Sequence, residues 1–278
     1  MARLLPVLAV ALLALPARAQ TPTVLGEGII STDQIEYGPA FSPDGNTLYF
    51  TRRASFSDAP QILVSRRTDQ SWTEPEAVSF GHPAGDELPS LSPDGMRLYF
   101  SSARPAPGRE DNGRNDMWMV SWQDGGWSEA EHLGGSLSTD DIDSHPVETD
   151  DGLYFHSRRG GAVDAYFAAG EVGAWSDPEV LPFNSDATDG EVALLPDGTG
   201  AVFYSERPGG AGRGDLYFVA RTDSGWGDPV NLGDTINTDA WEWSPGFTAL
   251  GKSLVFGRLN GAGDDSDLLV VEFQAPGR

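Results

Sequence analysis

The chain contains no cysteine, so disulfides cannot hold the fold together and a hydrophobic core must do so. After the first residues it also lacks any apolar run long enough to span a bilayer, and it has no long helical periodicity. Basic residues are scarce, with 18 against 42 acidic ones and a formal net charge of −24. This charge argues against nucleic acid and against an anionic membrane surface as partners.

The first apolar run has the pattern of a secretory targeting signal. A short basic start, the run from Leu4 to Leu15, and Ala17-Arg18-Ala19 match the three regions of a secretory signal peptide. We therefore expect residues 1–19 to be a signal peptide and residues 20–278 to be one domain. The mature protein is expected in the periplasm or secreted, as a monomer without a membrane span.

The chain is rich in glycine and proline, with 34 Gly and 20 Pro, which indicates many turns. The phrase "SPDGNTLYF" at Ser42–Phe50 returns as "SPDGMRLYF" at Ser92–Phe100, and weaker copies follow. Ser-Pro-Asp-Gly suits a type I turn, with proline presetting the entry. The repeats are anchored on the turn glycines Gly45, Gly95, Gly152, Gly198 and Gly251.

Each repeat of about 50 residues contains four short segments with strand character, as expected of a β-propeller blade. The last repeat lacks its fourth segment, but "PTVLGEGIISTDQIE" from Pro22 matches "PVNLGDTINTDAWE" from Pro229. The sequence therefore predicts an all-β, five-bladed propeller with four antiparallel strands per blade. The N-terminal strand is expected to complete the last blade and close the ring.

The stretch from Ser205 to Pro245, together with the two SPDG phrases, resembles the WD40-like β-propeller repeat of the TolB type. The resemblance covers nearly all of the mature chain. It implies an envelope protein whose blades form a binding platform, although similar repeats also occur in enzymes. Similar blades often stand beside a peptidoglycan-binding domain, and we expect none attached here.

An acidic residue stands nine positions before every turn glycine. In a propeller these carboxylates would ring one mouth of the central channel, where two interpretations are open. The first is that each accepts backbone hydrogen bonds or pairs with an arginine from the set Arg53, Arg104, Arg159, Arg207 and Arg258. The second is a site for Ca²⁺, which prefers oxygen ligands. The candidate metal ligands are Glu36, Asp86, Asp143, Asp189 and Glu242.

Positions that differ between repeats are better candidates for specificity. Seven and eight residues before the glycines the repeat loses its symmetry, and two Trp residues flank Glu242. These side chains would suit a sugar ring or a peptide, although packing between blades would also explain the Trp pair. The candidate binding residues are Tyr37, Glu87, His145, Glu191, Trp241 and Trp243.

The sequence contains no Cys nucleophile, no G-x-S-x-G elbow and no H-E-x-x-H motif. We therefore expect a non-enzymatic platform of the cell envelope that holds a protein or carbohydrate ligand at the channel mouth. The alternative is a carbohydrate-active enzyme, a glycoside hydrolase or lyase, that uses carboxylates at the mouth. In that case His145 and Glu191, which break the symmetry of the repeat, are the expected catalytic residues.

Overall fold

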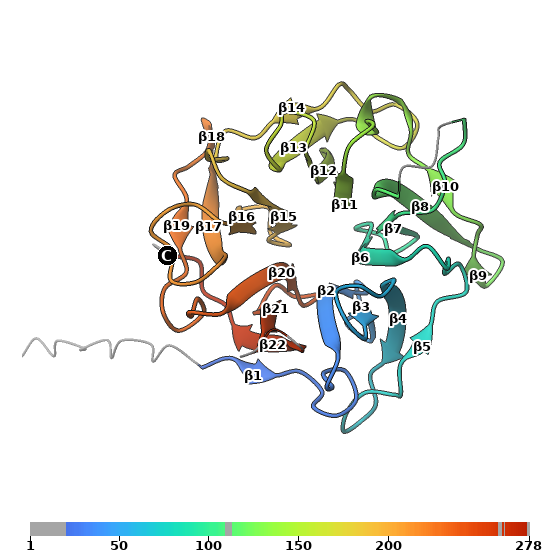
Figure 1. Cartoon of the computed structure of the whole chain (residues 1–278), viewed down its shortest axis with the longest axis horizontal. Coiled ribbons are helices and arrows are strands. Elements are labelled where there is room, and N and C mark those ends of the chain that lie inside the picture. The colour runs from blue at the N-terminus through green and yellow to red at the C-terminus, as the bar shows by residue number, and fades with distance from the viewer. Residues whose placement is uncertain (1–20, 109–112, 261–262, 264, 277–278) are drawn as a thin grey trace, which may run out of the picture.

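The computed structural model describes residues 21–276, except 109–112, 261–262 and 264. The expected signal peptide thus lies outside the described residues. The described chain is a ring of short antiparallel strands around a central axis (Figure 1). The one helical turn in it is a 3-10 turn, η1, at Gly135–Leu137. No helix in the described ranges is long and apolar enough to cross a membrane.

Five strands line the centre of the ring, and each contacts the next all the way around. All five begin at or next to the acidic position of the repeat, because that carboxylate fixes the loop before the strand. The innermost strands are β2 (Ile35–Phe41), β6 (Asp86–Leu91), β11 (Asp143–Thr149), β15 (Asp189–Leu194) and β20 (Trp241–Phe247).

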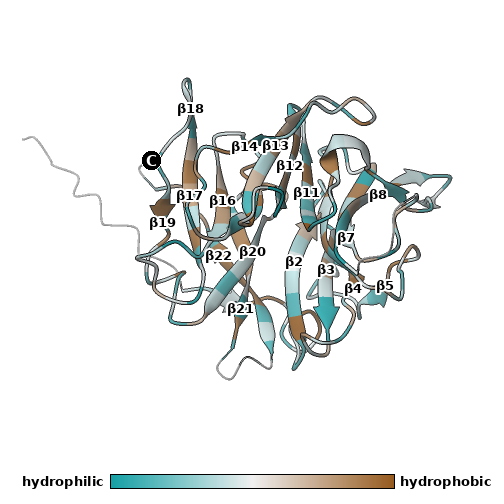
Figure 2. Ribbon diagram, turned by 45° about the horizontal axis from the view of Figure 1, so that its top comes forward, coloured by the Kyte–Doolittle hydropathy of each residue, from teal (hydrophilic) through white to brown (hydrophobic). Residues whose placement is uncertain are grey.

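The repeated turn joins each innermost strand to a second strand, as the sequence predicts. The second strands are β3 (Thr47–Arg53), β7 (Arg97–Ser102), β12 (Gly152–Ser157), β16 (Gly200–Ser205) and β21 (Ser253–Leu259). The third strands are β4 (Gln61–Arg66), β8 (Asp116–Gln123), β13 (Asp164–Ala169), β17 (Asp215–Thr222) and β22 (Ser266–Glu272). Figure 2 shows hydrophobic stretches along strands such as β17, with more polar connecting loops.

The outer strands are only two residues long. They are β5 (Glu76–Ala77), β10 (Glu131–His132), β14 (Glu179–Val180), β19 (Val230–Asn231) and β1 (Thr23–Val24). Two further strands of two residues each fold back on a third strand. They are β9 (Gly126–Trp127), which pairs with β8, and β18 (Gly225–Trp226), which pairs with β17. The N-terminal β1 pairs with β22, with Thr23 opposite Val270, so the two ends of the described chain share one set of strands as the sequence predicts.

Hydrogen bonding groups the strands into four sheets, of which one has eight strands. That sheet consists of the runs β20-β21-β22-β1 and β2-β3-β4-β5, which meet at one parallel bridge between Ile35 and Ser266.

The core lies between neighbouring groups of strands. Tyr49 and Ile62 of one group pack with Leu98 and Trp118 of the next. The Phe of the recurring phrase is at most 2% exposed in every copy, at Phe50, Phe100, Phe155, Phe203 and Phe256. Burying one such side chain stabilises the fold by roughly 1.5–3 kcal/mol, so the phrase supports the core.

Candidate functional site

The five repeated carboxylates are buried, and each forms an ion pair with an arginine of the adjacent second strand or the loop after it. The N–O distances are 2.6–2.8 Å, for Glu36–Arg52, Asp86–Arg104, Asp143–Arg159, Asp189–Arg207 and Glu242–Arg258. The expectation that Arg53 belongs to this set is wrong, because Arg52 takes that place.

The second oxygen of each carboxylate is also engaged. It accepts the backbone N–H four positions earlier, as from Thr139 to Asp143 at 2.5 Å. The equivalent donors are Thr32, His82, Ser185 and Thr238. No group of three or more His, Cys, Asp or Glu side chains that would hold a metal occurs among the described residues. The five carboxylates are thus part of the frame of the ring, as the first interpretation predicted, and the calcium site stays a prediction.

Seven residues before each turn glycine, the innermost strand contains a β-bulge. The residue there has a left-handed backbone in all five strands, with φ between 47° and 61°. Glycine occupies it once, as Gly38, and the other copies are Leu88, His145, Glu191 and Ser244. A non-glycine residue in this region costs on the order of 1 kcal/mol.

The bulge turns its N–H toward the preceding group of strands. Leu88 donates to Thr51 Oγ1 at 2.9 Å and His145 donates to Ser101 Oγ at 2.8 Å. Ser244 donates to the Glu191 carboxylate at 2.7 Å. The first two bonds connect an innermost strand to the second strand of the preceding group, and the third connects two innermost strands. The strained backbone therefore has a structural cause.

Two of the predicted binding residues meet directly at the start of the innermost strands. The Tyr37 hydroxyl donates a short hydrogen bond to Glu87, and Asn115 Nδ2 donates to the other Glu87 oxygen at 2.5 Å. Tyr37 is fully buried, whereas Glu87 is half-buried. Burial, with the Glu87 charge second, raises the pKa of Tyr37 well above its usual value, so its hydroxyl stays a donor.

The Trp pair joins Tyr37 in one aromatic cluster. The Tyr37 and Trp243 rings stack at 4.4 Å between centroids, and Trp243 stacks on Trp241 at 5.1 Å. The Arg53 guanidinium lies 5.2 Å from the Tyr37 ring and 4.4 Å from the Phe56 ring. Trp243 is 7% exposed, so its ring faces are occupied by the protein and it packs between strands, as the sequence interpretation allowed.

Glu191 occupies the bulge position of β15 and is half-buried. Burial raises the pKa of its carboxyl to about 7, and the nearby Glu87 charge adds to the shift. The hydrogen bond from Ser244 opposes the shift only in part. Two carboxylates near the centre therefore differ in their surroundings. Glu191 has its pKa raised by burial, whereas Glu87 accepts hydrogen bonds from Tyr37 and Asn115.

His145 is 5% exposed and packs beside His156, with ring centroids 6.4 Å apart. Burial lowers the pKa of His145 to about 3 and that of His156 to about 4, so both rings are neutral near pH 7. Within the described part of the chain, the Nδ1 atom of His145 has no hydrogen-bond partner.

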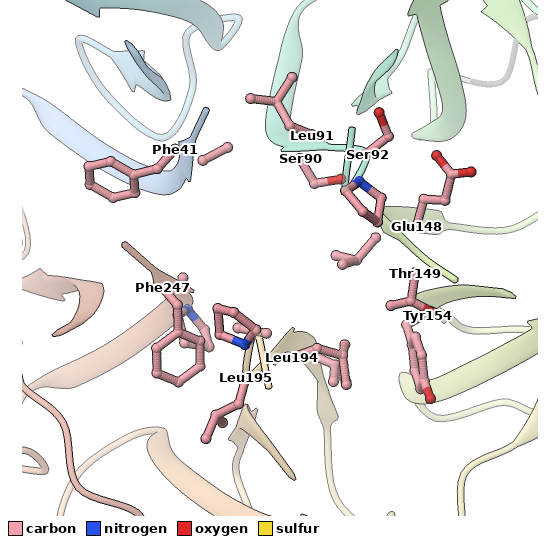
Figure 3. A pocket seen from close by; sticks show the side chains of 18 of the residues that line it. Phe41, Ser90, Leu91, Ser92, Glu148, Thr149, Tyr154, Leu194, Leu195 and Phe247 are labelled. Atoms are coloured by element: carbon pink, nitrogen blue, oxygen red, sulfur yellow. The ribbon is translucent and has the colours of Figure 1, made fainter. Parts of the chain in front are cut away.

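A cavity of about 560 Å³ opens at the other end of the innermost strands, where the repeated turns lie. We call it the turn-side funnel. Figure 3 shows residues of the innermost strands arranged around its centre, among them Phe41, Leu91, Leu194 and Phe247. Its walls also contain Pro39, Pro43, Pro89, Pro93, Pro196 and Pro245, and His145 is the predicted binding residue that lines it.

Sequence reasoning placed the candidate site at the acidic mouth and did not predict this cavity. The signal was present in the prolines of "GPAF", "LPSL" and "SPGF" and in the Pro-Asp-Gly turns. In the sequence these residues were interpreted only as parts of turns and strands. The sequence alone does not show that they lie around one axis.

No protein-family model and no curated protein matches this chain. Among solved structures it is similar to TolB from Acinetobacter baumannii, with a TM-score of 0.54 and 16% identity over 87% of this chain. The chain spans about half of that protein, 55% of its length.

It is also similar to an α-L-arabinofuranosidase from Lactobacillus brevis, with a TM-score of 0.58 and 14% identity over 90% of this chain and 94% of that one. A thermostable family-43 glycoside hydrolase has a TM-score of 0.61 and 10% identity over 91% and 94%. Identities this low establish the fold alone. The protein is a β-propeller.

Proposed function

We propose that the chain forms five blades of four strands, exported through the signal at residues 1–19. The single Ile35–Ser266 bridge in the eight-stranded sheet supports a division there, because two full ladders of four strands meet at one residue pair. On this count β1 supplies the outer strand of the last blade, and the repeat is of the TolB type.

We further propose that the protein is a non-enzymatic binding platform of the cell envelope, and that its ligand or protein partner sits in the turn-side funnel. The observation that carries this proposal is the cavity of about 560 Å³. Its size falls within the range of ligand sites, which are typically preformed and mostly apolar. Its lining prolines have a fixed φ, and three of them, Pro39, Pro89 and Pro245, lie on innermost strands.

The opposite mouth supports a binding role less well. Tyr37 is fully buried and Trp243 nearly so, which leaves little ring surface for a ligand. The Glu87 oxygens already accept hydrogen bonds from Tyr37 and Asn115. We therefore place the binding site at the turn end of the channel.

A neutral apolar fluorescent probe, N-phenyl-1-naphthylamine, tests this proposal. We expect saturable enhancement of its fluorescence with the purified mature protein, lost in Leu194→Glu because the new carboxylate enters the wall. The matched control is Val180→Glu on outer strand β14, where the side chain is 57% exposed. Lack of saturable binding to the wild type, or equal binding by Leu194→Glu, would reject the funnel as the site.

A second candidate function is glycoside hydrolysis, favoured by the two central carboxylates. Such enzymes pair a neutral acid with an ionised carboxylate, and unlike surroundings create that difference. Glu191, with a pKa of about 7, fits the acid, and Glu87, held by Tyr37 and Asn115, fits the partner. Glu87 then takes the catalytic role that the sequence analysis gave to His145, because the His145 side chain is buried.

Hydrolysis of p-nitrophenyl α-L-arabinofuranoside, together with a panel of glycans, tests this second candidate. Turnover by the wild type that disappears in Glu191→Gln and Glu87→Gln, but persists in the exposed-site variant Glu206→Gln, would establish an enzyme. The absence of turnover on every substrate would favour the platform.

A further inference from the structure

The aromatic cluster at the end of the innermost strands opposite the funnel reaches the surface through two side chains. Phe56, in the loop between β3 and β4, is 41% exposed, and Trp241, at the start of β20, is half-buried. Their rings are nearly parallel, with 15° between the planes and 6.3 Å between the centroids. Tyr37 and Trp243 are the buried members of the same cluster, so a ligand would reach it through Phe56 and Trp241.

An arginine lies over each of these two rings. The Arg53 guanidinium is 4.4 Å from the centre of the Phe56 ring, and the Arg213 guanidinium is 4.1 Å from the Trp241 ring. The backbone helps to hold Arg213 there, because its N–H donates at 3.1 Å to the carbonyl of Ala240, which directly precedes Trp241. Two guanidinium groups from distant parts of the sequence therefore lie at one aromatic surface.

Neither of these arginines has an acidic partner among the described residues. The adjacent Arg52 shows the difference, because its Nε donates to Glu36 at 2.7 Å and its Nη2 donates to two backbone carbonyls. The Nε of Arg53, by contrast, is buried without an acceptor in the described chain. Arg213 is exposed and rests on its tryptophan. The fold thus pairs the charge of Arg52 and leaves those of Arg53 and Arg213 without a counterion in the part of the chain that the structure describes.

The carboxylates around this surface limit the charge that a ligand can carry. Burial raises the pKa of Tyr37, and the charges of Glu87 and Glu191 add to the shift, so both carboxylates lie close to the cluster. The exposed Glu206 accepts a hydrogen bond at 2.6 Å from Tyr204, whose ring also packs against the cluster. The whole chain carries a net charge of −24. This field repels a polyanion, so a small ligand with a single negative charge fits the surface best.

We propose that this surface is a second binding site, for a small ring compound that carries one carboxylate. The ring loses contact with water on Phe56 and Trp241. The exposed Arg213 donates charge-assisted hydrogen bonds to the carboxylate, and the charge of Arg53 adds to the attraction. The site is separate from the turn-side funnel, and the neutral naphthylamine probe lacks the group that Arg213 would bind.

Two pairs of compounds that differ in charge test this inference and distinguish a sugar acid from an aromatic acid. They are methyl β-D-glucuronide with methyl β-D-glucoside, and benzoate with benzamide. NMR follows the indole N–H signal of Trp241 as each compound is added to the labelled mature protein. We expect a saturable shift with at least one carboxylate, weakening as salt is raised, and little response to either neutral compound. The carboxylate that binds more tightly identifies the source of the ligand.

Arg213→Gln removes the exposed charge while the backbone bond to Ala240 can remain, and it should weaken carboxylate binding about tenfold. Arg67→Gln is the matched control, because Arg67 is also exposed and lies over a tryptophan, 5.1 Å from the Trp72 ring. It should leave the affinity unchanged. The inference is overturned if neither carboxylate gives a saturable shift, if the neutral compounds bind equally well, or if the two variants have the same affinity.

Discussion

The Glu191 carboxylate accepts a hydrogen bond from the backbone N–H of Ser244 at 2.7 Å, and this bond connects strands β15 and β20. The carboxylate has this role while its pKa, raised by burial to about 7, lies far above the ordinary value of 4.5. The folded protein thus holds this proton more tightly than the unfolded chain does. The stabilisation from it is complete below about pH 4.5 and disappears as the pH rises through 7.

Glu191→Gln should remove this pH dependence, because a neutral amide can accept the same hydrogen bond at every pH. Above pH 7 the variant should be more stable than the wild type, by up to about 3 kcal/mol. Urea unfolding at pH 5 and pH 8 measures the effect, with Glu179→Gln on the exposed strand β14 as the control. Identical pH dependence in wild type and Glu191→Gln would disprove the assignment.

The Asp189–Arg207 pair, 2.8 Å apart, should behave as part of the frame. Asp189→Ala leaves a largely buried guanidinium without its partner and should lower the free energy of unfolding by about 3–5 kcal/mol. Asp223→Ala, at an exposed position of the β17–β18 turn, should change it by less than about 0.5 kcal/mol. Chemical denaturation gives both values, and a similar small loss in each variant would refute a structural role for the ion pair.

The closure by the N-terminal segment should also be measurable. Ile30 is fully buried in a cluster with residues of β3 and β22, so Ile30→Ala should cost about 2–5 kcal/mol. Val24, in β1 itself, is 38% exposed, and Val24→Ala should cost far less. Equal losses in thermal melts of the two variants would contradict the closure described here.

His145 and His156 should remain neutral in mildly acidic solution, because burial lowers the pKa values to about 3 and 4. Their stabilising contribution is present above the ordinary histidine value of 6.5 and is lost as the pH falls toward 4. Ring nitrogen chemical shifts measured by NMR between pH 8 and pH 5 should stay at neutral values for both residues. A protonation midpoint near 6.5 would contradict their burial.

The strands were predictable because the same residue pattern for strands and turns recurs in each repeat. "LYF" marks the buried second strand, Pro-Asp-Gly marks the turn, and the match between Pro22 and Pro229 reveals the closure by β1. The acidic position was also visible, but its role depends on whether an arginine reaches it. Adjacent Arg52 and Arg53 point to different partners, which spacing alone cannot show.

The candidate site in the turn-side funnel was harder to predict, because residues from several repeats form it together. Phe41 and Leu194 lie in different repeats, and nothing local indicates that both line one cavity. The loss of symmetry at Glu191 and His145 was seen in the sequence, whereas the left-handed backbone shared by that position was not. A bulge has no strict residue requirement when tertiary hydrogen bonds offset its strain.

The most direct test of the account is NMR mapping of the labelled mature protein with the apolar probe N-phenyl-1-naphthylamine. We predict that the largest shifts fall on the methyl groups of Leu91, Leu194 and Leu195, which line the turn-side funnel. The indole signals of Trp241 and Trp243, at the other end of the innermost strands, should stay unchanged. Shifts centred on the two Trp residues, with the leucine methyl groups unaffected, would contradict the account.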